Sequence, residues 1–517
     1  MRKLIFSLLF SLLMAAPLSA QFVTNVYSIT TNIESLHNTR VEIEKGEKWW
    51  AISPEGFAMN MRDLSDPASD MFLTNMLVSS AGRYIWSPQL MSIDVTGDDS
   101  MTIGSDIGEV EVKKAGKTLR EAYLYCMHSN VKPGVIPDGV LFSKPLYRPS
   151  LHTGVFGGQD EIVAYAERIV AEGLPRGTIV IPDGWSSIHV PFRFDAEIYP
   201  DPAALIEILH GLGFRVMLTI PSEIPALGRS YFEAAQHGRL LGTPGTPVIS
   251  EGRAAFDLLD GEAEKWFAGK VTELKKQYKF DGYWYAGMPW GASALAENYM
   301  NNLAKLSSGT ADVVANVYKT PMTPYVVNAN RREEVAPLPE IVCNLLSASL
   351  SGISGVVIEP PFEAATTNDT TEIVHYMLLA ACMPVATVDF VPWEFSEQNL
   401  QKQVKDALLF RESIAGYMEK LVEESAKTAE PIMRHMEYQF PRQGFSDCND
   451  QFMLGSKYLI APCMDHEAKR MVRLPKGRWK DRNGKVFKGP LVTEADCSQG
   501  LIYFEHAEGL QDILRLR

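Results

Sequence analysis

Two apolar runs decide the fold of this chain: residues 177–185 read GTIVIPDGW, and residues 213–223 read GFRVMLTIPSE. Each run holds four or five consecutive apolar or β-branched residues, as expected of a parallel strand that is covered on both faces. A predicted amphipathic helix precedes each run, over 160–173 and 201–213, and both helices close at a glycine. Strands and helices repeating in this order predict a parallel α/β fold.

Further apolar runs continue the pattern at 283–285, 325–327, 355–358 and 384–388. With predicted helices between most of them, the repeated unit extends over residues 148–428, which favours a closed (β/α)₈ TIM barrel over an open sheet. Its last part, residues 397–428, is predicted to be one long helix packed on the barrel.

Two β-rich stretches flank the predicted barrel. Residues 21–147 show short alternating runs broken by Gly, Asp, Asn and Pro, which predict an N-terminal antiparallel β-sandwich. Residues 429–517 return to alternating strands, with predicted turns at Pro475-Lys476-Gly477 and Asn483-Gly484. They predict a small C-terminal β domain.

The N-terminus predicts export. Residues 1–3 are basic after Met1, residues 4–14 are apolar, and a stretch rich in small residues ends at Ala20, so residues 1–20 are expected to form a signal peptide. The apolar stretch is too short to span a membrane. We therefore expect a periplasmic or secreted protein. Its six cysteines show no C-x-x-C pair, so they are expected to be mostly buried, with disulfides as the alternative.

Charge excludes one class of partner. The formal net charge of −14 argues against nucleic acid, because binding a phosphate backbone needs a clustered excess of Lys and Arg. No metal-ligand spacing and no phosphate-binding loop is found, so neither a metal nor a cofactor is expected. A neutral substrate fits this negative net charge better than nucleic acid does.

Polar residues follow the predicted strands, where barrel enzymes place their chemistry. Carboxylates at strand ends beside aromatic rings suggest a sugar site, in which polar groups bind hydroxyls and ring faces stack on the pyranose. The alternative is that the acids cap helices and the aromatics belong to the core. The strand-end residues are Asp183, Glu223, Ala286, Asn328, Asn330, Glu359 and Asp389, and the aromatics are Trp185, Trp284, Tyr285, Trp290 and Trp393.

Short motifs occur in a fixed order along the chain: IPDGW at 181–185, FRFD at 192–195, YPDP at 199–202 and LHGLG at 209–213. Near the C-terminus follow EPIMR at 430–434, DQFMLG at 450–455, LIAP at 459–462 and LPKGRW at 474–479. This order resembles glycoside hydrolase family 31, over about residues 145 to 485. The resemblance implies a retaining α-glycosidase that acts on carbohydrate through two carboxyl groups about 5 Å apart.

The resemblance also locates the catalytic positions, and this sequence departs from the family there. The nucleophile of the family closes a stretch that reads DGYWYA at 281–286, so its position holds Ala286. The acid/base position falls near Asn330 in a shortened loop, where Glu333, Glu334 or Glu359 are the candidate substitutes. The residues expected to bind substrate are Asp183, Trp185, Asp195, Asp281, Trp284, Arg331 and Asp389.

Three hypotheses follow from the missing carboxylate. The first is a degenerate family member that binds α-linked carbohydrate without ordinary retaining hydrolysis, because losing the nucleophile removes the covalent step. The second is an active glycosidase with rearranged carboxylates. The third is a structural or partner-binding barrel without a sugar function. The carboxylates available to the second are Asp183, Glu223, Asp281, Glu333, Glu359 and Asp389.

Overall fold

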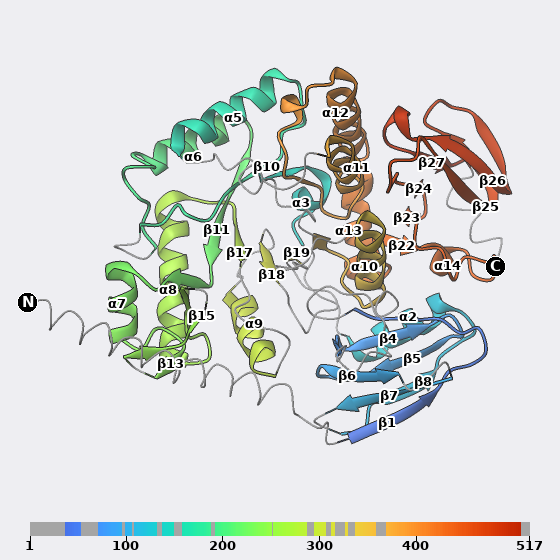
Figure 1. The fold of residues 1–517 in the computed structure, drawn as a ribbon, viewed down its shortest axis with the longest axis horizontal. Helices are drawn as coiled ribbons and strands as arrows, with labels where there is room; N and C mark the ends of the chain where they lie inside the picture. The colour runs from blue at the N-terminus through green and yellow to red at the C-terminus, as the bar shows by residue number, and fades with distance from the viewer. Residues whose placement is uncertain are drawn as a thin grey trace, which may run out of the picture.

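The structure is a computed structural model of the 517-residue chain. It describes residues 37–52, 71–95, 99–105, 108–131, 137–148, 158–187, 192–243, 245–250, 252–286, 294–306, 312–315, 326–328, 337–357 and 369–507. Figure 1 shows an α/β barrel with two β-rich parts stacked on one side of it, the N-terminal strands in blue and the C-terminal strands in red.

The N-terminal part is a β-sandwich of two four-stranded antiparallel sheets. One sheet has the order β1-β7-β6-β3 and the other the order β2-β4-β5-β8. The strands are β1 His37–Glu42, β2 Trp49–Trp50, β3 Met71–Leu73, β4 Met76–Ser79, β5 Arg83–Trp86, β6 Met91–Val95, β7 Ser100–Ser105 and β8 Glu111–Lys114.

Alternation along the second sheet explains how the sandwich joins the rest of the molecule. Trp49 and Leu77 lie in the core between the two sheets. Their neighbours Trp50 and Met76 point to the other face, into a second cluster that also contains Leu350 from the barrel. Successive side chains of a strand face opposite sides, so both faces of this sheet are buried.

Two helices in the N-terminal region were not predicted. They are α2, Leu119–Asn130, and α3, Gly139–Ser143. Thr118 caps α2 by accepting a hydrogen bond from the Glu121 N–H, and Asp138 caps α3 by accepting one from the Val140 N–H. The barrel also begins before residue 148, because its first strand is β9, Leu146–Tyr147.

Eight parallel strands form the barrel sheet, in the order β20-β19-β18-β17-β11-β10-β9-β21. This is sequential order around a ring, and the last strand, β21, pairs with the first, β9. The predicted (β/α)₈ class is confirmed. The strands after β9 are β10 Thr178–Ile181, β11 Arg215–Pro221, β17 Gly282–Ala286, β18 Val313–Ala315, β19 Val326–Asn328, β20 Val356–Val357 and β21 Thr387–Val388.

Helices cover the sheet, and the glycines predicted to close two of them do so. After α6, the N–H groups of Gly213 and Phe214 donate to the carbonyls of His210 and Leu209, and Gly213 adopts a φ of +89°. Gly173 ends α5 in the same way. The barrel helices are α5 Gln159–Ala171, α6 Pro202–Gly211, α8 Gly261–Tyr278, α9 Ala294–Leu306, α10 Leu338–Leu350, α11 Thr370–Ala380 and α12 Gln398–Ser413.

The predicted single helix over 397–428 is two helices. After α12 the chain breaks at Ile414, which has φ −103° and ψ 9°, and continues as α13, Ala415–Thr428. At the break the Ser413 hydroxyl donates to the Phe410 carbonyl and competes with the helical backbone pattern.

The C-terminal part contains a six-stranded antiparallel sheet of order β22-β23-β24-β27-β25-β26. The predicted Asn483-Gly484 turn joins β25 to β26, with Gly484 at φ +84°. The elements are β22 Met433–His435, α14 Met436–Gln439, β23 Phe452–Leu454, β24 Tyr458–Ile460, β25 Lys469–Asp481, β26 Val486–Asp496, the 3₁₀ turn Cys497–Gln499 and β27 Tyr503–His506.

The turn predicted at residues 475–477 is wrong, because β25 continues through it. The pairing with β26 shifts between Leu474 and Gly477, so these residues form a bulge within the strand. The facing residue is Gly489, where a Cβ atom would collide with the Pro475 carbonyl oxygen. Pro and Gly therefore mark a bulge here, and only the partner strand distinguishes it from a turn.

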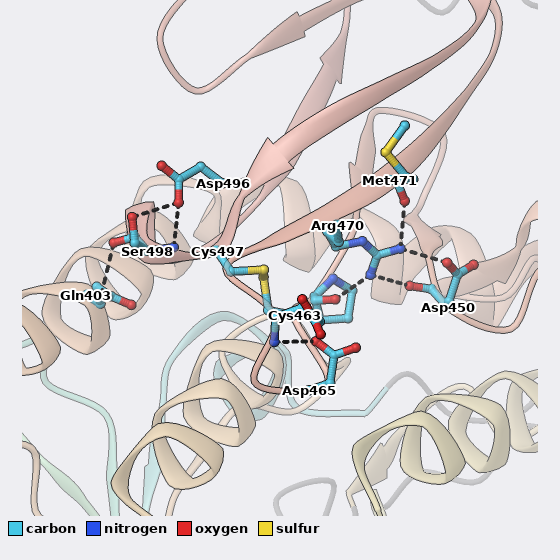
Figure 2. Close-up of a disulfide and its surroundings, with 11 residues drawn as sticks. Gln403, Asp450, Cys463, Asp465, Arg470, Met471, Asp496, Cys497 and Ser498 are labelled. Atoms are coloured by element: carbon cyan, nitrogen blue, oxygen red, sulfur yellow. Dashed lines mark hydrogen bonds and ion pairs between the residues drawn. A yellow bond between two sulfur atoms is a disulfide. The ribbon is translucent and has the colours of Figure 1, made fainter.

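One disulfide lies in the C-terminal part, between Cys463 and Cys497 (Figure 2). Beside it the Gln403 amide of α12 donates to the Ser498 carbonyl, so the bridged segment also contacts the barrel. The remaining cysteines form no disulfide and are buried, as the sequence led us to expect of most of them: Cys126, Cys343, Cys382 and Cys448.

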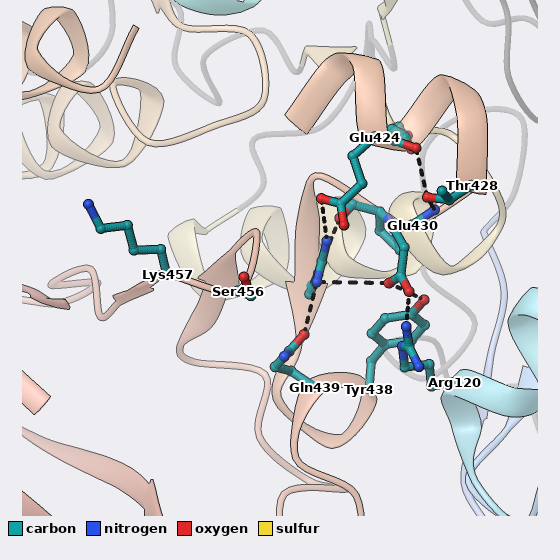
Figure 3. Close-up of polar contacts among 12 residues, drawn as sticks. Arg120, Glu424, Thr428, Glu430, Tyr438, Gln439, Ser456 and Lys457 are labelled. Atoms are coloured by element: carbon teal, nitrogen blue, oxygen red, sulfur yellow. Dashed lines mark hydrogen bonds and ion pairs between the residues drawn. The ribbon is translucent and has the colours of Figure 1, made fainter. Parts of the chain in front are cut away.

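A buried polar network joins the three parts of the molecule (Figure 3). Glu430, which follows α13, forms an ion pair with Arg120 of α2 and accepts a hydrogen bond of 2.9 Å from the Tyr438 hydroxyl. Arg434 of β22 lies 3.8 Å from the same carboxylate and 3.2 Å from Glu424. The barrel, the sandwich and the C-terminal sheet therefore meet around one carboxylate.

His435, beside this network, is a buried neutral histidine. Its ring lies 5.0 Å from the Trp50 ring, its Nδ1 accepts the Glu437 N–H, and its Nε2 lies 3.4 Å from the Asn449 Oδ1. Burial is the main cause that lowers the pKa of His435 from 6.5 to about 4. Protonation of Nδ1 would place its N–H against the backbone N–H of Glu437, and two facing donors repel each other.

We expect acid to destabilise the protein through His435. Its pKa is lower in the folded state, so its contribution is complete above pH 6.5 and is lost as the pH falls towards 4. The two pKa values correspond to about 3 kcal/mol. Thermal unfolding between pH 7.5 and 4 should show a flatter pH dependence for His435→Asn than for the wild type. His237→Asn, at an exposed histidine, is the control, and parallel curves for wild type and His435→Asn would contradict the prediction.

Candidate functional site

The carboxyl ends of the barrel strands form a mouth, and a long insertion covers part of it. The insertion runs from Ser222 to Asp260, between β11 and α8. It contains a three-stranded sheet of order β12-β16-β15 and a separate hairpin of β13 and β14. Its elements are β12 Glu223–Pro225, α7 Gly228–Gln236, β13 Gly242–Thr243, β14 Thr246–Pro247, β15 Ile249–Ser250 and β16 Arg253–Ala255.

Arg253 of this insertion brings two of the strand-end carboxylates together. Its Nη2 lies 3.7 Å from Asp183 Oδ2, and its Nε lies 3.6 Å from Glu223 Oε2. Nη2 also donates to the Glu223 carbonyl at 3.1 Å. About half of the Asp183 side chain (49%) is exposed, whereas Glu223 is buried. We refer to Asp183, Glu223 and Arg253 as the mouth cluster.

The floor beside Glu223 is a buried tyrosine. The Tyr299 hydroxyl of α9 donates to the Ser222 carbonyl at 3.3 Å. Burial, and then the Glu223 carboxylate, raise the pKa of Tyr299 well above its ordinary value. Tyr299 therefore stays protonated as a hydrogen-bond donor and supports the start of β12.

A second charged group fills the interior of the barrel. Arg148 follows β9 and Asp389 follows β21, and their side chains lie 3.7 Å apart while both are buried. The Arg148 guanidinium carbon lies 3.8 Å from the centroid of the Trp284 ring, a cation–π contact. The Tyr376 hydroxyl donates to Asp389 at 3.3 Å. Asp389 and Trp284, two residues predicted to bind substrate, are both buried, and both contact Arg148.

Trp185 and Asp195 also have structural partners. Trp185 is 1% exposed, its Nε1 donates to the Thr219 carbonyl at 2.7 Å, and its ring packs against Phe194. Asp195 accepts the Glu197 N–H in a turn. Trp185 thus offers no exposed face to a sugar ring, and Asp195 stabilises the loop that returns to α6.

Asp281 lies at the opposite end of the barrel from the mouth. It precedes β17, accepts the Val216 N–H at 2.7 Å and lies 2.9 Å from His210 Nε2. Arg215, at the start of β11, is 3.8 Å away. Amino ends of barrel strands serve stability, so these contacts give Asp281 a structural role, and its predicted part in substrate binding stays a prediction.

The position that the sequence predicts for the family nucleophile is the last residue of β17. Ala286 pairs in register with Pro221, two residues before Glu223 on the neighbouring strand. The mouth cluster is therefore adjacent to position 286. Several predicted site residues lie outside the described ranges: Asn330, Arg331, Glu333, Glu334 and Glu359.

Arg148, Arg253, Tyr299 and Tyr376 were missed in the sequence. Arg148 directly follows a strand of two residues, too short to be recognised as an apolar run. Arg253 lies 30 residues beyond Glu223, and only the return of β16 onto β12 brings it close. The position of Asp281 before its strand was a signal that it lies at the opposite end of the barrel from the mouth.

The described ranges show neither a candidate metal site nor a membrane-spanning helix. They contain no group of three or more His, Cys, Asp or Glu residues placed to hold a metal ion. None of the helices described is long and apolar enough to cross a membrane.

The arrangement suits binding of hydroxyl groups. Arg253 holds two carboxylates at the rim, and a partly exposed carboxylate such as that of Asp183 accepts hydrogen bonds from neutral donors. A guanidinium between the carboxylates offsets their mutual repulsion.

Two family models match the chain. Residues 150–342 match the glycosyl hydrolases family 31 TIM-barrel domain, and residues 429–505 match the glycosyl hydrolase family 31 C-terminal domain. Among curated proteins, the chain is similar to the myogenesis-regulating glycosidase of Mus musculus, at 22% identity over 398 residues. That match covers 70% of this chain and 55% of the mouse protein, so the chain spans about half of that relative.

Other relatives match over shorter or more divergent stretches. The α-glucosidase of Saccharolobus solfataricus is 28% identical over 138 residues, which are 25% of this chain and 20% of that one. Among solved structures, a family 31 α-xylosidase from a soil metagenome complexed with xylose has a TM-score of 0.72 at 17% identity, covering 92% of this chain and 80% of that one. A dextranase of Flavobacterium johnsoniae complexed with glucose has a TM-score of 0.75 at 15% identity, covering 91% and 66%. The structural likeness is one of fold.

Proposed function

The chain belongs to glycoside hydrolase family 31, and we propose that it binds α-linked carbohydrate at the barrel mouth without the retaining hydrolysis of the family. One observation carries the proposal: Arg253 holds the strand-end carboxylates of Asp183 and Glu223 together beside position 286, which has no carboxyl group. The Asp183 carboxylate would accept sugar hydroxyls, and Arg253 would hold it in place.

Relatives support the carbohydrate part of this proposal. The similar structures include an α-xylosidase with xylose and a dextranase with glucose. A retaining mechanism needs a second carboxyl group as nucleophile about 5 Å from the acid/base. An alanine at the nucleophile position removes that step while leaving the mouth cluster intact.

Export is part of the same proposal. The basic, apolar and small-residue segments within residues 1–20 have the order of a signal peptide. The Cys463–Cys497 disulfide agrees with a periplasmic or secreted location, because disulfides persist in oxidising compartments.

Binding measurements on mouth variants test the proposal. By isothermal titration calorimetry with isomaltotriose, Asp183→Asn and Glu223→Gln should each weaken binding by roughly ten- to a hundredfold, because a hydrogen bond to a charged group contributes about 1.5–3 kcal/mol. Glu233→Gln, in the same insertion but paired with Arg229 on exposed α7, is the control and should bind like the wild type. Equal affinities for all four proteins would contradict the proposal.

A second candidate function has a specific observation in its favour. Glu223 follows the strand that pairs with position 286, so it is a carboxylate close to where the family places its nucleophile. An active enzyme with rearranged carboxylates would turn over aryl α-glycosides and lose that turnover in Glu223→Gln, Asp183→Ala or Glu359→Ala. Absence of both turnover and sugar binding would favour a structural or partner-binding barrel.

A further inference from the structure

A cavity of about 300 Å³ opens between two helices of the outer layer, away from the mouth cluster. It lies where the C-terminal end of α5 meets the first half of α12, with the 3₁₀ turn Pro392–Glu394 between them. Figure 1 shows these two helices on the same side of the barrel. Sites for small molecules occupy roughly 300 to 1,000 Å³, so the cavity has room for a sugar unit of small size. We call it the outer pocket.

An anchored aromatic ring forms one wall of the outer pocket. Trp393 is half-buried, its ring centroid lies 5.3 Å from that of Tyr165, and the Arg168 guanidinium lies 5.8 Å from it. Both partners belong to α5. The indole is thus held against α5, and Trp393 also lines the cavity. A fixed aromatic face of this kind stacks on the apolar face of a pyranose.

The opposite wall is one face of α12. Gln398, Gln401 and Lys405 follow each other at helical spacing and all line the cavity. The Gln401 Nε2 donates to the Phe395 carbonyl at 2.6 Å and to the Trp393 carbonyl at 3.4 Å. Within the described part of the chain, the Gln401 Oε1 makes no hydrogen bond. An oriented amide oxygen is therefore available to a hydroxyl donor.

The charged groups of the outer pocket have partners in the protein, which decides the class of ligand. Lys405 donates to the carbonyl of Glu172 at 2.6 Å, at the negative end of the α5 dipole. Lys402 pairs with Asp406 at 2.7 Å, and the Glu172 carboxylate pairs with Arg168 at 2.5 Å. Because protein groups already engage each of these charged side chains, the pocket favours a neutral polyhydroxyl ligand over an anion.

We propose that the outer pocket is a second carbohydrate-binding site, which takes one neutral sugar unit of an α-linked glucan on the outer wall of the barrel. This inference rests on the proposed function for the identity of the glucan, but its residues are separate from the mouth cluster. Trp393 provides the stacking face, and Gln398 and Gln401 bind hydroxyls. Such a site would keep the protein on a polymer independently of the mouth.

Affinity electrophoresis in native gels containing dextran or soluble starch tests the proposal on the full-length protein. Trp393→Ala should lower the affinity for the polysaccharide, as measured from the retardation, about tenfold, which is the loss expected for one stacked ring. Gln398→Arg should do the same by filling the cavity from an exposed helix position that tolerates arginine. Asn399→Arg, the same change at the exposed neighbouring residue that does not line the cavity, is the matched control and should be retarded like the wild type.

Combining variants separates the two sites. In an Asp183→Asn background, adding Gln398→Arg should weaken the remaining affinity for the polysaccharide about a further tenfold. If Trp393→Ala and Gln398→Arg leave retardation unchanged in both the wild-type and the Asp183→Asn background, the proposal of the outer pocket is overturned. In that case, a loss of retardation caused by Asp183→Asn alone still supports carbohydrate binding at the mouth. If Asp183→Asn binds isomaltotriose normally and Gln398→Arg abolishes retardation, the mouth fails and the outer pocket stands. A wild type that neither gel retards would overturn the outer pocket.

Discussion

Replacing Arg411 by alanine should lower the free energy of unfolding by about 4 kcal/mol or more, the largest effect of any substitution considered for this chain. Arg411 of α12 is fully buried, and burial lowers its pKa to about 10, so it is charged at neutral pH. The guanidinium donates to the carbonyls of Met383 at 2.6 Å, Pro384 at 2.6 Å, Ala381 at 3.3 Å and Phe142. Without it, four buried carbonyl groups lose a donor.

The position of these carbonyls explains why a cation is stable there. Ala381 is the C-cap of α11, so three of the four acceptors lie at or just beyond the negative end of that helix. The fourth belongs to α3, so Arg411 joins α12 to α11 and to α3, next to the first barrel strand. Removal of Arg411 therefore loosens the closure between β21 and β9.

Two further variants separate the hydrogen bonds of Arg411 from its volume. Arg411→Met refills the space without donors and should still cost about 3 kcal/mol, because the carbonyls remain unpaired. Lys402→Met, at an exposed position on the same helix, should change stability by less than about 0.5 kcal/mol. Denaturant titration followed by circular dichroism measures both. Wild-type stability of Arg411→Met would show that the four carbonyls need no donor.

Removing the Cys463–Cys497 disulfide should cost about 3 kcal/mol. The bridge closes a loop of 34 residues, and cross-linking a loop of this length restricts the unfolded chain by about 3–4 kcal/mol. It joins the segment after β24 to the 3₁₀ turn after β26, at the base of the β25–β26 hairpin. The loss should therefore concentrate in the C-terminal sheet.

The disulfide experiment compares the double variant Cys463→Ala/Cys497→Ala with Cys448→Ala. Cys448 is a free, buried cysteine of the same hydrophobic cluster, so it controls for loss of a sulfur atom without loss of a cross-link. Dithiothreitol should lower the denaturant midpoint of the wild type and of Cys448→Ala, but not that of the double variant. A double variant as stable as Cys448→Ala would refute the expected contribution.

Local patterns were sufficient for the strands and helices of the barrel. The apolar runs near residues 180, 218, 284, 327, 357 and 387 all became barrel strands, since burial on both faces requires continuous apolar side chains. The strands β9 and β18 were not recognised, because two or three residues leave no periodicity to read. Glycine marked the ends of α5 and α6, since a left-handed residue is needed there.

Partners distant in the sequence decided the candidate site. Asp183 and Glu223 could be located at strand ends from the sequence, but Arg253 reaches them only because the insertion folds back on itself. The aromatic and acidic residues Trp185, Trp284 and Asp389 had the expected composition of a sugar site, yet each is enclosed by core partners. Composition specifies which groups are present, whereas burial depends on what packs over them.

The sequence by itself determined the (β/α)₈ barrel, its two β-rich companions and the alanine at position 286, because strand patterning and residue identity are local properties. Only the tertiary structure decided which strand-end groups face solvent, that Arg253 joins Asp183 to Glu223, and that Arg148 and Asp389 fill the barrel interior. The physical reason is that ion pairs and burial arise from contacts between segments far apart in the chain. The identity of a residue does not specify which distant segment will pack over its side chain.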